Sequence, residues 1–522
     1  MTGLLLAVPV LLPALGAGVV LLRLPRPAAR GVSTLVLAAV AADAAALLVL
    51  ADTRGPQALH VGGWPAPLGV PLVADRLSAL LLTVSALVAL AVLVFAIGQG
   101  TAEERRRSAE VFHPAYLLLV TGVSLAFLTG DLFNLFVAFE VMLAASYVLI
   151  TLNAGESRTR SGMTYTVVSM TSSLLFLTLV ALVYAATGTV NLAQLGPRLA
   201  ELPDGMRGAL ALLLLAVLGI KTAIVPLHFW LPDSYPTAPA PITAVFAALL
   251  TKVGVYALLR TQTLLFPRTG VWTLLACVAI AAMVVGILGA VAQDDLNRLL
   301  SFTLVSHIGY MLFGLALFDT RGLTGTVLYV VHHIVVQAAL FLAAALVVRR
   351  TGTAALHRMA ERPPAGALLV VLFSLPALSL AGVPPFSGFV AKLALLRAGV
   401  AEAGPAAYAL TAAALLTSLL TLYAMTRVVT SAFMAQPARS ARGEASAPPE
   451  PPSPAEAAQP SARVRGGPPG SRLMIGAAVA MTATGLAVAA CAGPLARLGD
   501  RAAHDLLDPR QYRSVVLHEE DR

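Results

Sequence analysis

The sequence is poor in charge and in cysteine. Charged residues make up 12% of its 522 residues, about half the share typical of soluble domains, while 58% are hydrophobic. Its two cysteines, Cys277 and Cys491, lie in apolar segments, which excludes a disulfide framework and a cysteine-bound metal cluster. Apolar runs of roughly twenty residues, each long enough to cross a bilayer, recur from end to end. We therefore predict an all-α polytopic membrane protein.

About fourteen transmembrane helices are expected. The predicted spans are 3–22, 31–51, 72–98, 114–129, 131–152, 162–187, 207–230, 238–262, 271–290, 296–317, 323–348, 366–400, 406–434 and 472–492. The first run lacks the basic residues that open a signal peptide, so we expect it to remain in place. Residues 435–471, rich in proline, alanine and serine, predict a flexible loop, and the polar tail 493–522 is expected to be largely unstructured.

The distribution of arginine predicts the orientation of the chain. Loops after odd-numbered spans hold eighteen arginines, whereas loops after even-numbered spans hold seven: Arg54, Arg198, Arg207, Arg260, Arg268, Arg321 and Arg397. By the positive-inside rule the first set is cytoplasmic, which places both termini outside a bacterial-type plasma membrane and the 435–471 loop inside. This bias explains the formal net charge of +9 better than nucleic-acid binding, so no nucleic-acid partner is predicted.

Lysine is rarer still. The chain has three lysines, Lys221, Lys252 and Lys392, and each lies within a predicted span, whereas the 32 other basic residues are arginine. Arginine stays protonated in proteins, but a buried lysine can lose its proton at accessible pH. The pattern therefore predicts lysines that titrate. The alternative, a lysine whose head reaches the membrane interface, fits Lys392 best and Lys221 worst.

One carboxylate within a predicted span is available to pair with these lysines. Glu140 lies near the middle of the fifth span, with no other charge between Asp131 and Glu156. A buried carboxylate is either neutral or paired, and Lys221 is the natural partner. Such a pair can switch between its ionic and neutral forms as a unit when a proton approaches. The alternative is a static ion pair that holds two helices together.

Prolines accompany two of the lysines. Pro226 lies five residues after Lys221, and Pro384 and Pro385 precede Lys392. Proline breaks a helix, and such breaks at membrane depth are typical of transporters when an ionisable residue lies nearby. The breaks fall in spans seven and twelve. Because this offset of five spans reverses the helix direction, it predicts two inverted five-helix repeats.

The repeats divide the chain into segments. Residues 1–113 hold the first three spans, 114–262 the first five-helix repeat with the proton-conducting core, 263–434 the second repeat, 435–471 the loop, 472–492 the last span, and 493–522 the tail.

Four histidines lie at membrane depth. His228 follows Lys221 by seven residues, so the two share a helix face if the break leaves the helix aligned. His307 lies in the tenth span, and His332 and His333 lie in the eleventh, with Gln337 one turn beyond His333. Imidazoles suit proton relay because they titrate near neutral pH. A membrane histidine can instead serve only as a hydrogen-bonding group between helices.

Four runs carry a resemblance to a known family. FNLFVAFEVMLAASYVL, GIKTAIVPLHFWLPDSYPTAPAPITAVFAALLTKVGVY, NRLLSFTLVSHIGYM and LAGVPPFSGFVAKL resemble the antiporter-like membrane subunits of respiratory complex I. They are most similar to the D subunits of Mrp-type multisubunit cation/proton antiporters, over about residues 70–430.

The resemblance implies fourteen helices, two inverted five-helix repeats with helices seven and twelve broken, and a central polar axis. It also implies that Glu140 and Lys221 are the paired glutamate and lysine, Lys252 the bridging lysine, and Lys392 the exit-side lysine. Gln337 departs from the family, many of whose members carry lysine in the eleventh span.

Together these features predict a proton-conducting subunit of a multisubunit Na⁺/H⁺ antiporter. Its proton-translocating residues are predicted to be Glu140, Lys221, Lys252, Lys392, His228, His307, His332 and His333. Its expected partners are the other antiporter subunits, the lipid bilayer, protons and monovalent cations.

No haem, iron–sulfur, flavin or quinone motif is visible, so no cofactor, metal or catalytic site is predicted. The alternatives are a proton-pumping subunit of complex I, a membrane hydrogenase subunit and, in a different class, a structural scaffold.

Overall fold

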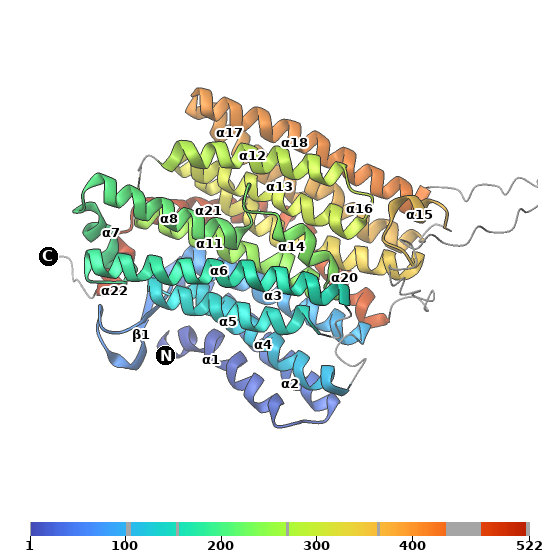
Figure 1. The fold of residues 1–522 in the computed structure, drawn as a ribbon, viewed down its shortest axis with the longest axis horizontal. Helices are drawn as coiled ribbons and strands as arrows, with labels where there is room; N and C mark the ends of the chain where they lie inside the picture. The colour runs from blue at the N-terminus through green and yellow to red at the C-terminus, as the bar shows by residue number, and fades with distance from the viewer. Residues whose placement is uncertain are drawn as a thin grey trace, which may run out of the picture.

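The computed structural model of the chain describes residues 2–100, 106–152, 156–267, 271–362, 366–434 and 471–517. Within these ranges the chain is almost wholly helical, and thirteen helices are long and apolar enough to cross a membrane. Most of them run side by side along the long axis of the molecule (Figure 1). The predicted all-α polytopic fold is confirmed. The loop predicted at 435–471 lies outside the described residues up to position 470.

The long helices and helical segments follow the predicted spans closely. They are α1 (Thr2–Leu21), α2 (Arg26–Arg54), α3 (Arg76–Gln99), α4 (Arg106–Leu128), α5 (Leu132–Ile150), α6 (Glu156–Thr187), α8 (Asp204–Thr222), α10 (Ala240–Val245) continuing through η3 (Phe246–Leu250) into α11 (Thr251–Leu264), α12 (Val271–Val291), α13 (Leu296–Leu317), α14 (Thr320–Thr351), α18 (Pro405–Val429) continuing into η4 (Thr430–Met434), and α20 (Arg472–Ala490).

Shorter elements connect these helices. They are β1 (Gln57–His60), η1 (Val61–Gly63), β2 (Pro71–Ala74), α7 (Leu192–Ala200), α9 (Trp230–Ser234), η2 (Tyr235–Thr237), α15 (Leu356–Ala360), α16 (Ala367–Ala381), α17 (Ser387–Glu402), α21 (Ala492–Leu507) and α22 (Arg510–Leu517). β1 and β2 form an antiparallel hairpin in which Gln57 pairs with Ala74 and His60 with Pro71.

Two helices are broken where the prolines predict it. α8 ends at Thr222, after which Ala223 takes a left-handed conformation (φ 60°) and the chain turns through Pro226 before α9 begins. α16 ends at Ala381, and α17 begins only at Ser387, beyond the two prolines. Proline cannot donate the next hydrogen bond of a helix, so the chain leaves the helical path at both places. The breaks in spans seven and twelve are confirmed.

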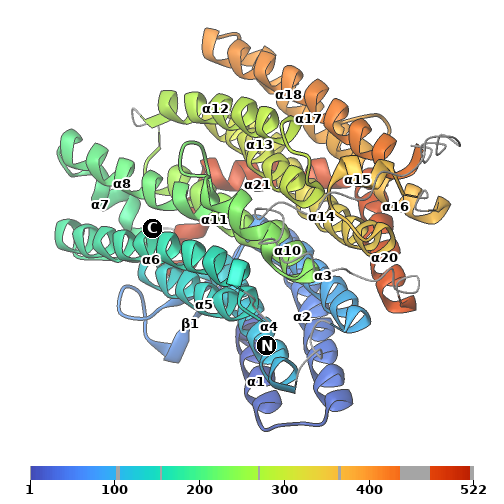
Figure 2. The ribbon, with the colours of Figure 1, turned by 45° about the vertical axis from the view of Figure 1, so that its right-hand side comes forward.

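The centre of the bundle is formed by α14 and by the continuous segment α10–η3–α11. Every residue of the most apolar stretch of each is buried. Figure 2 shows α1 and α2 at one side of the bundle and α18 at the other, with α11 and α14 between them. η3 is a short π-helix that ends two residues before Lys252. π-Helical turns are rare and occur mostly where a side chain serves a function.

The two halves of the chain repeat the same local pairing. Asp131 forms an isolated antiparallel bridge with Asn191, and Asp295 forms one with Ala355. The interval along the chain from Asp131 to Asp295 equals the interval from Asn191 to Ala355, and we call it the repeat interval. Asp131 and Asp295 also cap the helices that follow them, α5 and α13, by accepting a backbone hydrogen bond.

A Thr-Gly-Thr sequence recurs at the same repeat interval, at 187–189 and 351–353. The hydroxyls of Thr187 and Thr351 each donate to the carbonyl four residues earlier and to the carbonyl two residues later. α7 and α15, which follow these sequences, lie at opposite ends of the molecule (Figure 1). The two repeats are therefore related by inversion.

The C-terminal tail differs from the expectation. Residues 492–507 and 510–517 form α21 and α22, so the prediction of a largely unstructured tail is wrong over these residues. Arg76 donates to both oxygens of Asp505 at 2.9 and 2.8 Å, and Arg501 donates to Asp52. Burial raises the pKa of the Asp505 carboxyl above its usual value, although hydrogen bonds from Arg76 act the other way.

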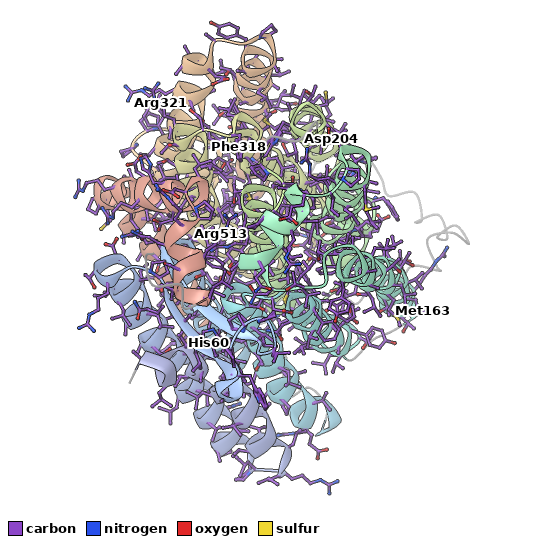
Figure 3. The ribbon with its side chains drawn as sticks, turned by 90° about the vertical axis from the view of Figure 1, so that its left-hand side faces the viewer. His60, Met163, Asp204, Phe318, Arg321 and Arg513 are labelled. Atoms are coloured by element: carbon purple, nitrogen blue, oxygen red, sulfur yellow. The ribbon has the colours of Figure 1, made fainter. Side chains whose placement is uncertain are left out.

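The tail folds because apolar residues recur at helical spacing between its charges. Leu498, Ala502 and Leu506 share one face, on which Ala502 and Leu506 are buried. α22 then reaches the hairpin, where His60 Nε2 lies 2.9 Å from the carbonyl oxygen of Val516. Figure 3 looks onto this end of the molecule and labels His60 of the hairpin and Arg513 of α22.

Candidate functional site

Lys221 and Glu140 face each other as predicted. α8 places Lys221 in its last turn, and α5 places Glu140 at mid-length. Lys221 Nζ lies 4.0 Å from Glu140 Oε1, which is an ion-pair distance but too long for a hydrogen bond. The ammonium instead donates to Ser173 Oγ of α6 at 2.7 Å and lies 5.4 Å from the centre of the Phe139 ring. The two side chains therefore form an ion pair without a direct hydrogen bond.

A small cavity lies beside Lys221. Its volume is about 30 Å³, and Tyr165, Ser169 and Trp230 are among the residues that line it. A cavity of this size holds about one water molecule when polar groups surround it. The Lys221 side chain is 8% exposed, but that of Glu140 is 37% exposed on the outer side of α5.

Lys252 is wholly buried at the centre of the bundle. Its Nζ donates to the carbonyl oxygen of Ala247 at 2.5 Å, within the π-helical turn that precedes it. Among the described residues no carboxylate forms an ion pair with Lys252. η3 packs against α14, the helix that carries His332 and His333.

A polar cluster links α13 and α14 beyond Lys252. The rings of His307 and His333 lie 5.3 Å apart, and the Tyr329 hydroxyl lies 2.7 Å from His307 Nδ1. Tyr329 in turn stacks on Tyr310, with ring centres 4.9 Å apart and planes within 7°. Neither ring nitrogen of His333 has a hydrogen-bond partner among the described residues, although both are buried. Buried polar atoms rarely stay unpaired, so these nitrogens suit exchange with mobile water or with a proton carrier.

Lys392 is held at the second helix break. Its Nζ donates to the carbonyl oxygens of Leu380 and Ala381, both at 2.9 Å, and to Ser418 Oγ at 3.0 Å. The two carbonyls end α16, where the helix dipole favours a cation. The ammonium also lies 5.0 Å from the centre of the Tyr310 ring. Lys392 is 4% exposed, so the alternative in which its head reaches the interface is wrong.

His332 and Gln337 also lie on α14, and each contacts a different neighbouring element. His332 Nδ1 lies 2.9 Å from Ser387 Oγ, at the start of α17, so the histidine connects α14 with the second break. Gln337 donates to the carbonyl of Leu300 at 3.1 Å, while its own Oε1 is buried and has no partner among the described residues.

His228 does not lie where the spacing argument puts it. Because α8 ends at Thr222 and the chain turns, His228 is not on a shared helix face with Lys221. It is half-buried in the turn before α9. The condition for a shared face, a helix that stays aligned across the break, is therefore not met, while a role for His228 in proton transfer remains a prediction.

One deeply buried cation lies outside the place that the sequence predicts. The arginine count assigns Arg260 to a loop although the predicted span 238–262 includes it, and the structure places it inside α11, where it donates to Asp75 at 2.5 Å. The side chains of both residues are almost fully buried, and Tyr256 and Tyr512 present their rings to the guanidinium at 5.5 and 5.1 Å. Arginine keeps its charge here, so this pair is structural rather than titrating.

Sequence reasoning also missed the tyrosines. Tyr310 follows His307 by three residues, and Tyr329 precedes His333 by four, so each shares a helix face with a histidine. That spacing could have identified them. The serines that contact the lysines, Ser173 and Ser418, come from other helices and have no such signal.

The comparisons with known proteins place the chain in a family. Residues 129–421 match the family described as NADH:quinone oxidoreductase/Mrp antiporter, TM. The chain belongs to this family. It is 42% identical over 383 residues to the Na(+)/H(+) antiporter D subunit of Alkalihalophilus pseudofirmus, and the matched region covers 73% of this chain and 76% of that protein. It is 39% identical over 384 residues to the corresponding D subunit of Bacillus subtilis, with coverage of 73% and 77%.

Solved structures agree with this membership in the NADH:quinone oxidoreductase/Mrp antiporter family. A chain of the Mrp complex from Dietzia sp. matches with a TM-score of 0.87 and 34% identity, over 98% of this chain and 99% of that one. A chain of respiratory complex I from Thermus thermophilus matches with a TM-score of 0.75 and 23% identity, over 97% and 100%, which shows a shared fold. The resemblance inferred from the four sequence runs is confirmed.

Proposed function

We propose that this chain is the proton-conducting subunit of a multisubunit Na⁺/H⁺ antiporter in the plasma membrane. Identity of 42% to an antiporter D subunit, against 23% to a complex I chain, supports antiport over a respiratory pump. The observation that carries the proposal is the placement of the three lysines of the chain. All three lie in the membrane bundle, and each donates to a neutral oxygen within hydrogen-bond distance.

A lysine that is hydrogen-bonded to a neutral oxygen can lose its charge without leaving an unpaired charge on its partner. A carbonyl or hydroxyl oxygen accepts a hydrogen bond from either the ammonium or the neutral amine. Lys252 bonds to the Ala247 carbonyl, and Lys392 bonds to two carbonyls and Ser418. When Lys252 or Lys392 loses its proton, no buried carboxylate is therefore left unpaired. An unpaired buried carboxylate would be costly.

Glu140 sets the charge of Lys221. At 4.0 Å, without a direct hydrogen bond, the carboxylate favours the protonated lysine but leaves it free to bond Ser173. Protonation of Glu140 removes that attraction, so Lys221 then releases its proton more readily. The route proposed for the proton runs from this pair to Lys252 at the centre of the bundle.

In the second half the proton passes between histidines and tyrosines. His333 and His307 stand between the central segment and Tyr329, and Tyr310 stands between Tyr329 and Lys392. Imidazole and phenol groups can both donate and accept, so water bound among them completes a path. Gln337 cannot carry a net proton and serves here to orient its neighbours.

A neighbouring subunit is proposed to cover Glu140. A carboxylate that is 37% exposed at bilayer depth is costly against lipid, and apolar side chains such as Phe133 and Tyr147 are exposed along the same helix. Both described ends of the chain contact the hairpin: Gly3 lies beside Leu59, and Val516 lies beside His60. These contacts support the prediction that both termini lie on the same side of the membrane. By the arginine bias that side is the outside.

The test is ΔpH-driven Na⁺/H⁺ exchange in everted membrane vesicles that contain the assembled complex. Glu140→Gln and Lys221→Met should each lower exchange by about a hundredfold, as loss of a proton-transfer group does, while assembly is unchanged. Glu201→Gln, at an exposed glutamate at the end of α7, is the matched control. Normal exchange in the assembled Glu140 and Lys221 variants would refute the proposal.

A further inference from the structure

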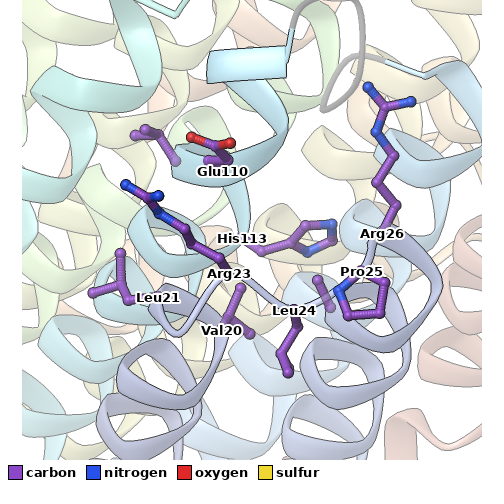
Figure 4. Close-up of a pocket in the computed structure, with 10 residues that line it drawn as sticks. Val20, Leu21, Arg23, Leu24, Pro25, Arg26, Glu110 and His113 are labelled. Atoms are coloured by element: carbon purple, nitrogen blue, oxygen red, sulfur yellow. The ribbon is translucent and has the colours of Figure 1, made fainter.

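A cavity of about 500 Å³ opens between the turn that joins α1 to α2 and the start of α4 (Figure 4). Among the described residues that line it, Arg23, Arg26, Glu110 and His113 are polar and the others are apolar. None of the lysines and histidines of the proposed proton route is among its described lining residues. We propose that this cavity binds the phosphate of a membrane phospholipid headgroup.

The two arginines supply the charge. Figure 4 shows Arg23 and Arg26 on opposite sides of the His113 ring, with their guanidinium groups pointing away from each other. Neither arginine forms an ion pair with any residue that the structure describes. Guanidinium groups bind phosphate oxygens through paired, charge-assisted hydrogen bonds. Both side chains are long enough to turn inward, and a phosphate bound between them would draw them together.

The backbone of the turn serves the same site. Arg23 has φ 62°, a left-handed conformation that favours glycine, yet an arginine stands there. α2 then begins at Arg26 behind Pro25, and no side chain caps its first turn. Free backbone N–H groups at a helix start favour an anion, so the uncapped turn adds to the attraction of the arginines.

The charge balance favours a phosphodiester. Among the described lining residues, two arginines and one glutamate carry formal charges, which sum to one positive charge apart from His113. A phospholipid headgroup such as phosphatidylglycerol carries one negative charge on its phosphodiester, whereas free inorganic phosphate is a mixture of the monoanion and the dianion at neutral pH. Glu110 therefore selects against the dianion.

An apolar track leads from the cavity along the membrane. Leu4, Leu11 and Leu15 are exposed on α1 at intervals of seven and four residues, which places them on one helix face, and the exposed Leu22 follows directly after the helix. This row ends beside Leu21, which lines the cavity. An acyl chain can lie along the row while its headgroup phosphate occupies the cavity. Basic pockets at the cytoplasmic ends of membrane helices bind lipid headgroups in this way.

The experiment uses the assembled complex in phosphatidylcholine vesicles that contain a small fraction of photoactivatable phosphatidylglycerol. After irradiation, mass spectrometry should locate the label on the peptide that contains residues 20–29. Labelling should fall about tenfold in the double variant Arg23→Gln/Arg26→Gln. It should persist in Arg23→Lys/Arg26→Lys, which keeps the charges and controls for folding. Arg54→Gln, at an exposed arginine on the other end of α2, should label as the unmodified protein does.

Three results would overturn the inference. One is the absence of label from the α1–α2 turn in the unmodified protein. Another is equal labelling of the glutamine double variant. The third is loss of the label when inorganic phosphate is added in excess, since the cavity would then take soluble phosphate rather than lipid.

Discussion

The two inverted repeats place a lysine at the same kind of helix break but surround it differently. In the first repeat Lys221 faces a carboxylate, Glu140, at 4.0 Å. In the second repeat Lys392 is held by the carbonyl ends of α16 and by Ser418. The residue that follows Glu140 at the repeat interval is Leu304, which is apolar and buried. The first lysine therefore has a carboxylate as its counter-charge, and the second has fixed dipoles.

The tyrosines show the same contrast. Tyr165 and Tyr329 are separated by the same repeat interval and occupy matching places on α6 and α14. The Tyr165 hydroxyl lies 2.6 Å from Ser146 Oγ, whereas the Tyr329 hydroxyl lies 2.7 Å from a histidine. The second repeat thus uses aromatic and imidazole groups where the first uses small hydroxyls. We interpret the first repeat as the half that senses charge and the second as the half that relays protons.

The largest effect is expected at Lys252, which lies between the two halves. Lys252→Arg keeps the positive charge but prevents its loss, so exchange in everted vesicles should fall by about a hundredfold. Arg397→Lys, at an exposed arginine of α17, is the control and should leave exchange unchanged. Unmodified exchange in the Lys252 variant would show that a fixed charge suffices at the junction.

A smaller, asymmetric effect is expected at the paired tyrosines. Tyr329→Phe leaves His307 Nδ1 without its hydroxyl partner and should slow exchange about tenfold, since an unpaired buried polar group costs on the order of 1–3 kcal/mol. Tyr165→Phe should change exchange by less than about twofold, because Ser146 still donates to the Leu143 carbonyl at 2.9 Å. Equal effects of the two substitutions would remove the distinction between the halves.

The smallest effect on transport is expected at the C-terminal helices, which lie outside the proposed proton route although α21 packs against α14. Asp505→Asn weakens the bond to Arg76 and should lower the melting temperature of the purified protein by about one degree, for a loss of roughly 1 kcal/mol, with exchange unchanged. Asp500→Asn, at an exposed aspartate of the same helix, should leave both quantities as they are. A transport defect in the Asp505 variant would mean that the tail belongs to the proton route.

Local chemistry explains what the sequence could predict. Pro226 and the Pro384–Pro385 pair mark the helix breaks because proline lacks a backbone donor, and the lysines stand out because a buried ammonium is costly. Glu140 and Lys221 could be paired because no competing charge lies near either in the sequence. These inferences depend on the residues themselves and on their close neighbours.

Tertiary contacts explain what the sequence could not predict. The left-handed turn at Ala223 moves His228 away from the face of Lys221, and the burial of Arg260 depends on Asp75 and on Tyr512 of the distant tail. α21 folds because its apolar face packs against α14. This contact cannot be inferred from the charged residues of α21. Ser418 can be matched to Lys392 only after the helices are packed.

The central claim is that protons cross the second repeat through the histidines. Na⁺/H⁺ exchange of His333→Ala, measured in everted vesicles at several pH values from about 6 to 9 around the ordinary pKa of histidine, tests it most directly. His504→Ala, at an exposed histidine of α21, is the control. The account predicts that the His333 variant assembles and exchanges at least about tenfold more slowly across this range. Exchange equal to that of the unmodified complex at every pH would contradict it, and would leave the first repeat as the sole conducting half.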